Sequence, residues 1–327
     1  MNKFSIILPV RNGGDYVKEC VNSILAQTVA DFDLLVLDNN SNDGTPQWLA
    51  SLNDHRIKIF PSADSLTIEQ NWARVVEVPK NEFITLIGHD DLLLPHYLDE
   101  MNKLIEKHPH ASLYQSHFSF IDGKGNFKSN CKPMDEVQHA HEFLASQFTR
   151  TLDSTGTGYM MRSKDYDQLG GIPNYPNLIF ADYQLWVQLT FKNYKATSAK
   201  QCFSYRIHDS VSKLTNGEHY RLAFERYLVF LAGIKKQNED ISSAIEKYGY
   251  DWIMYMCESL SHRLLKTPVA LRKITVSDFI RNCKKHAAEL LPGQKFEPSS
   301  KFRIWIAALL DKNVLGRKLF FLYKKMS

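Results

Sequence analysis

The sequence predicts an α/β fold, in which a Rossmann-type mixed sheet is flanked by helices and followed by a helical C-terminal extension. Two observations support this class. Over the first 95 residues, short apolar runs typical of buried parallel strands alternate with segments of helical periodicity. After Lys213 the composition shifts to long segments with apolar residues at helical spacing. At 327 residues, the chain is also longer than one small domain needs.

The first half of the chain alternates strand and helix patterns. The predicted strands cover residues 4–10, 32–37, 57–60 and 83–87, and the predicted helices cover 17–25, 45–49 and 68–78. Such an alternation predicts a doubly wound sheet with right-handed crossovers. Ligands bind to sheets of this kind at the carboxyl ends of the strands. Residues that follow these strands are therefore the candidates for a binding site.

The second half is less regular. A helix is predicted at 98–108, strands at 112–116 and 118–121 with a hairpin turn at 122–126, a strand within 155–162, a helix start at 180–189 and a strand before 204. Helices are then predicted at 219–234, 244–265 and 276–290. We divide the chain into an α/β domain of residues 1–214 and a helical region of residues 215–327.

Cysteine usage and the N-terminus indicate a cytoplasmic protein. The five cysteines form no C-x-x-C pair, which argues against a zinc knuckle and a disulfide framework. Met1 leads straight into a strand pattern, so we expect no signal peptide. No apolar stretch approaches the roughly 20 residues that cross a bilayer.

Charge is distributed unevenly along the chain. Residues 262–327 contain 15 Lys and Arg against 4 Asp and Glu, a net charge of 15 − 4 = +11, so the first 261 residues carry 4 − 11 = −7. The apolar and basic stretch at 301–325 is compatible with a helix docked on the body or on a second subunit, which would make a homo-oligomer. It is equally compatible with a peripheral anchor on the inner face of the plasma membrane. A nucleic-acid partner is not expected, because no stacking-rich motif accompanies the basic residues.

The most informative stretch is residues 83–95, where an apolar run ends in Asp90 and Asp91. Two adjacent carboxylates repel each other, and a hard cation such as Mg²⁺ or Mn²⁺ would relieve the repulsion. This predicts a metal site that holds a diphosphate. An ordinary helix start is the alternative, because Asp is a good N-cap and Pro95 suits a first helical turn.

Polar turns follow the other predicted strands as well. They contain Arg11 and Asn12 after the first strand, and Asp38, Asn39 and Asp43 after the second. Together with His89 and the acid pair they predict a polar pocket of nucleotide size. The G-x-G-x-x-G signature and the P-loop are both absent, so a metal would have to neutralise the phosphates.

These residues form a pattern that resembles the family-two inverting glycosyltransferases, which have the GT-A fold. The matching blocks are residues 5–13, 23–28, 37–45, Asn71, 88–91, 170–171, 181–186 and 205–208. They occur in the expected order over about the first 215 residues. The resemblance implies a nucleotide-sugar-binding half at 1–95 and an acceptor-binding half at 96–214.

The resemblance also implies a role for each matching residue. A nucleotide-sugar donor would be bound by Pro9, Arg11, Asn12, Asp38, Asn39, Asp43, Asn71, His89, Asp90 and Arg206. Asp90 matches the last acid of the family's Asp-x-Asp motif and would hold Mg²⁺ or Mn²⁺, with His208 able to touch the metal. Asp182 matches the catalytic base, although a carboxylate near a helix start can also be only a cap.

Three positions depart from the family pattern. Gly88 replaces the first acid of Asp-x-Asp, Ala181 replaces the acid that precedes the base, and Asn39 stands where a second acid is common.

From the matching motifs we predict an inverting, metal-assisted transferase. It would move a sugar, most simply from a UDP-sugar, to a hydroxyl of a glycan or lipid-linked glycan. A non-catalytic glycan-binding or scaffold protein with a degenerate site is the alternative. A sugar nucleotidyltransferase is a weaker one, because residues 11–14 are too short and too poor in Lys for its phosphate loop.

Overall fold

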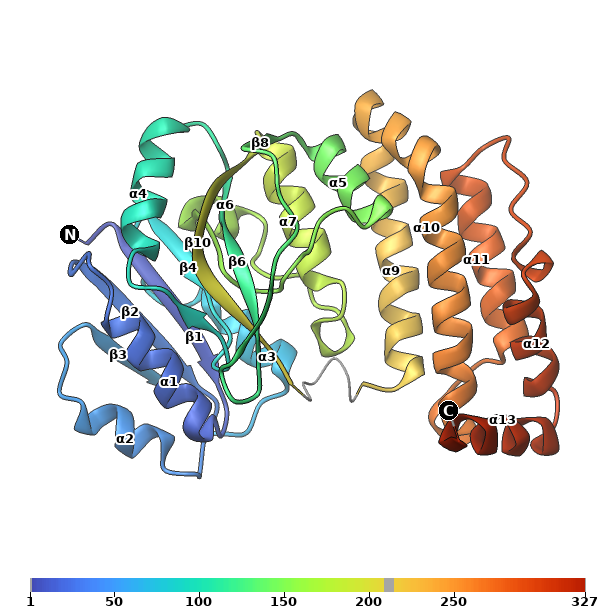
Figure 1. Ribbon diagram of the computed structural model, residues 1–327, viewed down its shortest axis with the longest axis horizontal. Coiled ribbons are helices and arrows are strands. Elements are labelled where there is room, and N and C mark those ends of the chain that lie inside the picture. The colour runs from blue at the N-terminus through green and yellow to red at the C-terminus, as the bar shows by residue number, and fades with distance from the viewer. Residues whose placement is uncertain (1, 209–214, 327) are drawn as a thin grey trace. The chain divides into compact units, whose positions relative to one another are not determined.

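The computed structural model describes residues 2–208 and 215–326, which divide into two compact units (Figure 1). The first unit comprises residues 1–143, 151–174 and 181–210, and the second comprises 144–150, 175–180 and 211–327. The predicted boundary between residues 214 and 215 borders the stretch 209–214, which lies outside the described residues. Two short segments, 144–150 and 175–180, join the helical unit although the sequence gives no sign of it.

The first unit is built on one mixed sheet. Its strands are β1 (Phe4–Val10), β2 (Phe32–Asp38), β3 (Ile57–Pro61), β4 (Phe83–Leu86), β5 (Leu92–Leu93), β6 (Leu113–Asp122), β7 (Phe127–Asn130), β8 (Val137–Gln138), β9 (Tyr159–Arg162) and β10 (Lys195–Ile207). Among the described residues the order is β3-β2-β1-β4-β9-β6-β10-β5, with β7 on β6 and β8 on β10. The first four strands in this order are parallel, and β9 runs antiparallel to both of its neighbours. The predicted mixed sheet is confirmed.

Helices of the first unit alternate with these strands. They are α1 (Gly14–Leu25), α2 (Thr45–Ser51), α3 (Ile68–Ala73), α4 (Tyr97–Lys107), α6 (Ser163–Gln168) and α7 (Ala181–Lys192), with a 3₁₀ turn η1 (Arg74–Val76) after α3. Alternate residues of β1, such as Ile6 and Leu8, pack with Val21 of α1 and Met101 of α4 in the main core. Every second residue of the strand faces the core and packs against one face of a helix. For this reason the strand and the helices could be predicted from the spacing of apolar residues. The helix predicted at 68–78 is shorter than expected, because its last turn is 3₁₀.

The second unit is helical. It contains η2 (Pro176–Leu178), α9 (Gly217–Lys235), α10 (Glu239–Lys266), η3 (Val269–Leu271), α11 (Val276–Leu290), η4 (Pro298–Ser300), α12 (Phe302–Asp311) and α13 (Val314–Met326), and it takes most of α5 (Ala140–Thr149). Side chains of Asn216, Asn238 and Thr275 cap the first three long helices, which fixes where each begins. The ring of Trp252 lies 4.8 Å from Phe148 and 5.6 Å from Phe224 at the centre of this core.

The basic stretch at 301–325 forms two helices, α12 and α13. Ile304 and Ala307 bury one face of α12. Phe302, Trp305 and Leu309, spaced at i, i+3 and i+7, remain 70%, 48% and 41% exposed on another face. Within the described residues no helix is both long and apolar enough to cross a membrane.

Candidate active site

The loops after β1 and β2 are bonded to each other through their polar side chains. Asn12 Oδ1 accepts a hydrogen bond from the Asn42 backbone N–H at 2.8 Å, and the Asn12 N–H donates to Ser41 Oγ at 2.9 Å. Asp43 accepts the N–H groups of Gly14 and Thr45 at 2.9 and 3.1 Å. These contacts use Asn12 and Asp43 to shape the edge of the sheet. Pro9 is buried within β1, and Arg11 is exposed beyond it.

Asp38 carries an acceptor atom that is unused. It is the last residue of β2 and is 3% exposed, and its Oδ2 accepts the Ser41 N–H at 3.3 Å. Within the described part of the chain its buried Oδ1 has no hydrogen-bond partner. A buried acceptor without a donor is costly unless a ligand supplies one.

Asn39 and Asn71 have amides that are already occupied. Asn39 Nδ2 donates to the Leu66 carbonyl at 2.9 Å, while its Oδ1 accepts the Leu66 N–H at 2.7 Å. Asn71 Nδ2 donates to the Leu37 carbonyl at 3.2 Å, and its Oδ1 accepts from Arg74 at 2.9 Å. Both residues therefore hold the walls around Asp38, and their expected contact with a nucleotide stays a prediction.

The acid pair after β4 is divided into two different environments. Asp91 is 2% exposed, and its carboxylate accepts Thr157 Oγ1 at 2.6 Å and the Arg206 backbone N–H at 3.0 Å. Burial, followed by the neighbouring charge of Asp90, raises the pKa of Asp91 well above its usual value. Asp90 is more accessible, so Asp91 organises the site and Asp90 faces the exterior of the protein.

Gly88 stands where the family has the first acid of its Asp-x-Asp motif, and the Asp90 carboxylate lies beside it. A Cβ at this position would lie 2.6 Å from Asp90 Oδ1 and 3.3 Å from Asp91 Oδ2. The Asp90 carboxylate therefore occupies the space into which an acidic side chain at residue 88 would extend. His89, the residue between them, is half-buried, and burial lowers its pKa.

The end of β10 brings Arg206 and His208 to the acid pair. Arg206 Nε donates to the Asp90 carbonyl at 2.7 Å, and its NH2 contacts Glu19 Oε2 of α1 at 2.5 Å. His208 Nε2 lies 2.5 Å from Asp90 Oδ2. Both side chains therefore contact Asp90, and their expected roles toward a diphosphate and a metal stay predictions.

Asp182 lies in the first turn of α7, where it is partly buried. Burial is the largest effect on the Asp182 carboxyl and raises its pKa to about 6. Hydrogen bonds from the backbone of Tyr183 and Asp182 lower the pKa by less. A Cβ on Gly156 would lie 3.8 Å from Asp182 Oδ2, so backbone packs beside this carboxylate. Such a pKa suits a general base that works near neutral pH.

Residues 155–158 connect the two acidic positions. Thr155 accepts a 3.0 Å hydrogen bond from Trp186 of the Asp182 helix through its carbonyl. Two residues later Thr157 donates to Asp91 at 2.6 Å, and the Gly158 N–H donates to the Leu86 carbonyl of β4 at 3.0 Å. The structure thus brings Asp90, Arg206 and His208 together, and residues 155–158 link Asp91 beside them to the helix of Asp182.

Sequence reasoning missed four residues of this site. Thr157, Tyr16 and Glu19 support Asp91, His208 and Arg206, and Asp91 itself was counted only as part of the acid pair. Tyr16 packs its ring 5.2 Å from that of His208 and 4.7 Å from the Arg206 guanidinium. Two helix-surface residues, Tyr16 and Glu19, carry no motif that could have identified them.

A polar pocket of this kind occurs in many protein families, and one known family matches this chain. Residues 5–170, just over half of the chain, match the model of glycosyl transferase family 2. The chain belongs to this family. The predicted family resemblance is confirmed.

Relatives of this chain are named as glycosyltransferases. An uncharacterized glycosyltransferase of Rickettsia conorii is 30% identical over 193 residues, which are 57% of this chain and 31% of the relative. GlyG of Streptococcus pneumoniae is 22% identical over 38% of this chain and 42% of its own length. The chain therefore spans less than half of these two relatives. The putative teichuronic acid biosynthesis glycosyltransferase TuaG of Bacillus subtilis is 26% identical over 64% of this chain and 81% of TuaG.

The fold has a counterpart among solved structures. The S. aureus TarS 1–349 structure aligns with a TM-score of 0.62 over 99% of this chain and 92% of that one, at 16% identity. A second TarS 1–349 structure, in complex with UDP-GlcNAc, aligns with a TM-score of 0.59 at 15% identity. These similarities confirm the predicted GT-A-like fold with a C-terminal helical region.

Proposed function

We propose that this glycosyltransferase is an inverting enzyme that takes a sugar from a nucleotide diphospho-sugar, most simply a UDP-sugar. Its acceptor would be a hydroxyl of a glycan or lipid-linked glycan. The observation that carries the proposal is the pairing of two acids with different tasks. Asp182, with a pKa of about 6, is joined through residues 155–158 to the acid pair, of which Asp90 would meet the diphosphate.

The nucleotide would bind along the ends of β1, β2 and β4. Asp38 Oδ1 supports this placement, because a buried acceptor without a partner suits a donor such as a nucleobase N–H. Arg11, Asn12 and His89 would contribute from the loops, while Pro9, Asn39, Asp43 and Asn71 would fix the pocket walls. TarS has been crystallised with UDP-GlcNAc and with UDP, which favours a uridine nucleotide here.

A divalent ion fits the residues beside the diphosphate. Asp90 Oδ2 and His208 Nε2 share a hydrogen bond of 2.5 Å, so an ion would contact both atoms only by replacing the proton between them and moving them apart. Over residues 2–208 and 215–326 no group of three or more His, Cys, Asp or Glu is arranged to hold a metal. The donor's own phosphate oxygens would thus complete the ligands of Mg²⁺ or Mn²⁺. When bound, the ion would neutralise charge on the departing diphosphate.

The chemical step follows from the position of Asp182. Its carboxylate accepts the proton of the acceptor hydroxyl as that oxygen forms a bond to the anomeric carbon of the donor sugar. The bond from this carbon to the diphosphate oxygen breaks on the opposite face, and the electron pair leaves with the nucleoside diphosphate. Attack from the opposite face inverts the configuration at the anomeric carbon. Arg206 keeps the Asp90 backbone in place during this step.

The acceptor and the place of action are proposed from the relatives and from charge. TuaG carries a name in teichuronic acid biosynthesis, which supports an acceptor of the cell-surface polysaccharide class, such as lipopolysaccharide or capsule. We propose that the enzyme works in the cytoplasm, peripherally on the inner face of the plasma membrane. The exposed stripe of Phe302, Trp305 and Leu309 on α12 supports the membrane contact. A homo-oligomer formed through the same helices is the alternative use of that stripe.

The competing hypotheses make different demands on the site. A scaffold with a degenerate site is favoured by Gly88 and Ala181, but it would not require a base of pKa about 6. A nucleotidyltransferase would need a basic phosphate loop after β1, where residues 11–14 contain a single Arg.

Hydrolysis of a panel of nucleotide-sugars, with and without Mn²⁺, tests the proposal. We expect slow, metal-dependent release of one nucleoside diphosphate by the wild type. Asp90→Ala should abolish the metal dependence, and Asp182→Ala should lower transfer to an added acceptor by about 10²- to 10⁴-fold while nucleotide binding persists. Asp99→Ala, which removes an acid on α4 that pairs with Lys103, is the control. Absence of both binding and turnover across the panel would reject the transferase mechanism and favour the scaffold.

A further inference from the structure

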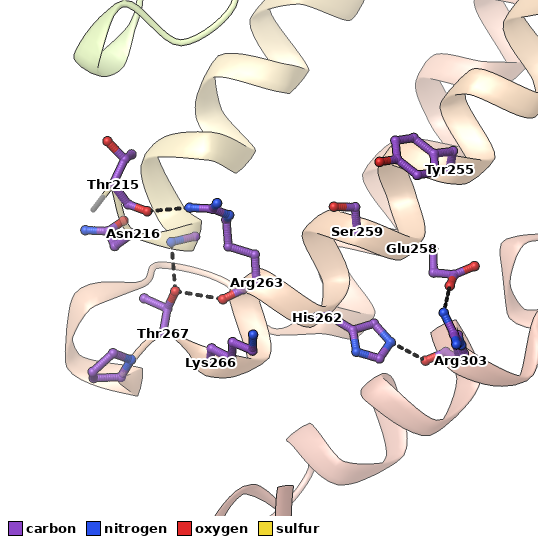
Figure 2. Close-up of a pocket in the computed structure, with 12 residues that line it drawn as sticks. Thr215, Asn216, Tyr255, Glu258, Ser259, His262, Arg263, Lys266, Thr267 and Arg303 are labelled. Atoms are coloured by element: carbon purple, nitrogen blue, oxygen red, sulfur yellow. Dashed lines mark hydrogen bonds and ion pairs between the residues drawn. The ribbon is translucent and has the colours of Figure 1, made fainter. Parts of the chain in front are cut away.

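The second unit contains a cavity of about 640 Å³ that the proposed reaction does not use (Figure 2). One face of α10 forms much of its wall. The lining residues of this helix recur at intervals of three and four: Tyr255, Glu258, Ser259, His262, Arg263 and Lys266. The start of α9, the residues after α10 and Arg303 of α12 complete the lining. This face of α10 is polar, whereas a helix face turned toward other helices is usually apolar.

Positive charge predominates in this cavity. Three side chains that are cationic at neutral pH line it, Arg263, Lys266 and Arg303, against one acid, Glu258. Arg303 NH1 donates to Glu258 at 3.2 Å, and the Arg303 side chain is still 75% exposed. The lining of the cavity therefore carries an excess of positive charge.

Its hydrogen-bond donors are partly fixed and partly available. Arg263 NH1 donates to the Thr215 carbonyl at 2.7 Å, and its guanidinium lies 3.9 Å from the ring centre of Tyr220, which holds the group in place. By contrast, in the described part of the chain Lys266 Nζ and Ser259 Oγ make no hydrogen bond or ion pair with protein. A fixed guanidinium beside available donors loses little conformational freedom when it binds an anion.

Helix ends alone do not explain this arrangement. Lys266 is the last residue of α10, where a cation is favourable beside the helix carbonyls. Arg303, however, comes from the first turn of α12, where a cation opposes the helix dipole. Its contact with Glu258 at 3.2 Å places it at the same hollow as Lys266.

We propose that this cavity binds a phosphoryl group. Arg and Lys side chains with a neighbouring hydroxyl are the donors that recognise phosphate in proteins. The volume lies within the usual range of ligand pockets and exceeds that of one phosphate ion, so the group belongs to a larger molecule. Two sources share this chemistry, a soluble phosphate ester and a phospholipid headgroup. The inference does not depend on the proposed transfer reaction, because it concerns residues of the second unit only.

A site-local signal tests the proposal in the full chain. The His262 ring lies in the cavity, and its ¹³C-labelled NMR signal can be assigned with His262→Gln. The soluble probes are inorganic phosphate and sn-glycerol 1-phosphate, and the membrane probes are phosphatidylglycerol and phosphatidylcholine vesicles. Because the signal reports from the cavity, phosphate bound at the nucleotide site does not imitate it.

Charge-matched variants complete the test. Lys266→Ala/Arg303→Ala should weaken the saturable shift of His262 by about tenfold or more, since each cation supplies a charge-assisted hydrogen bond. Lys236→Ala/Arg281→Ala removes the same charge from side chains that are 73% and 75% exposed outside the cavity, and it should bind like the wild type. Ser259→Asp, at an exposed position, should also prevent binding by repulsion.

Each outcome decides the proposal. A shift with soluble glycerol phosphate supports the cavity as a site for soluble phosphate esters. A shift with phosphatidylglycerol vesicles alone supports a lipid headgroup. Equal shifts with phosphatidylcholine and phosphatidylglycerol would support the phosphodiester that both headgroups share. The proposal is wrong if no probe moves the wild-type signal or if the cavity variant and its control bind equally.

Discussion

Asp182 and Asp91 show how burial assigns different properties to two carboxylates of one site. Both have a raised pKa because of burial, but Asp91 accepts hydrogen bonds from Thr157 and the Arg206 backbone. Among the described residues, Asp182 is bonded only by backbone of its own helix turn and remains partly exposed, so its carboxylate can meet a substrate hydroxyl. The pKa of about 6 then decides at which pH the base works.

The rate of sugar transfer should depend on pH through Asp182. The base acts only when it has lost its proton, so kcat/KM should rise with pH up to about 6 and level off above it. Measurement of kcat/KM between pH 4.5 and 8 checks this. His208→Asn is the control for a second titrating group and should keep the rise near pH 6 even if overall activity falls.

Gly156→Ala sharpens the same measurement. Its new methyl would lie 3.8 Å from Asp182 Oδ2, an ordinary contact distance, and would exclude water from the carboxylate. We expect the rise in kcat/KM to move to higher pH, because further desolvation raises the pKa. A wild-type profile that is flat from pH 4.5 to 7 would reject Asp182 as the base.

The segment at 155–158 connects the acid pair after β4 to the helix that carries Asp182. It bonds to α7 through Thr155, to Asp91 through Thr157 and to β4 through Gly158. Gly158 has a φ of +82°, and a Cβ there would lie 2.6 Å from the ring of Phe203 in β10. Glycine is therefore required at this position by backbone conformation and by close approach together.

Gly158→Ala should destabilise the protein more than a positive φ alone explains. Gly170→Ala is the matched control, because its φ is +77° and no atom lies within 4 Å of the added Cβ. We expect a loss of about 1 kcal/mol at residue 170 and about 3 kcal/mol at residue 158, where overpacking adds to strain. Urea unfolding of both variants measures the difference, and equal losses would contradict the role given to Phe203.

At the scale of the whole molecule, charge and exposed apolar surface coincide in the C-terminal region. Residues 262–327 carry a net charge of +11, and they include the exposed stripe of Phe302, Trp305 and Leu309. Aromatic groups beside basic residues favour the interface of an anionic bilayer. This surface is independent of the nucleotide site, so the two can be tested separately.

The double variant Phe302→Ser/Trp305→Ser should bind phosphatidylglycerol vesicles at least about tenfold more weakly in co-sedimentation. Both aromatic side chains of the stripe are then missing from the bilayer interface. Nucleotide binding should stay unchanged. Phe127→Ser, which removes a 64% exposed aromatic ring from β7, should bind vesicles like the wild type. Undiminished vesicle binding by the double variant would favour a subunit contact for this stripe, to be checked by sedimentation equilibrium.

The sequence by itself indicated the alternation of strands and helices in the first half, the edge of the sheet where polar turns gather, and the acid pair Asp90 and Asp91. These follow from local signals, because hydrophobic periodicity and turn residues act over a few neighbouring positions. The family resemblance added an assignment of roles, and the family itself is confirmed.

Only the tertiary structure decided how each polar atom is used. Thr157 and the Arg206 backbone reach Asp91 from 66 and 115 residues away, while His208 reaches Asp90. Leu66 occupies the Asn39 amide, and nothing described occupies Asp38 Oδ1. The helical cavity likewise combines α10 with Arg303 of α12. Hydrogen bonding and burial depend on which distant segments meet, and no local pattern encodes those meetings.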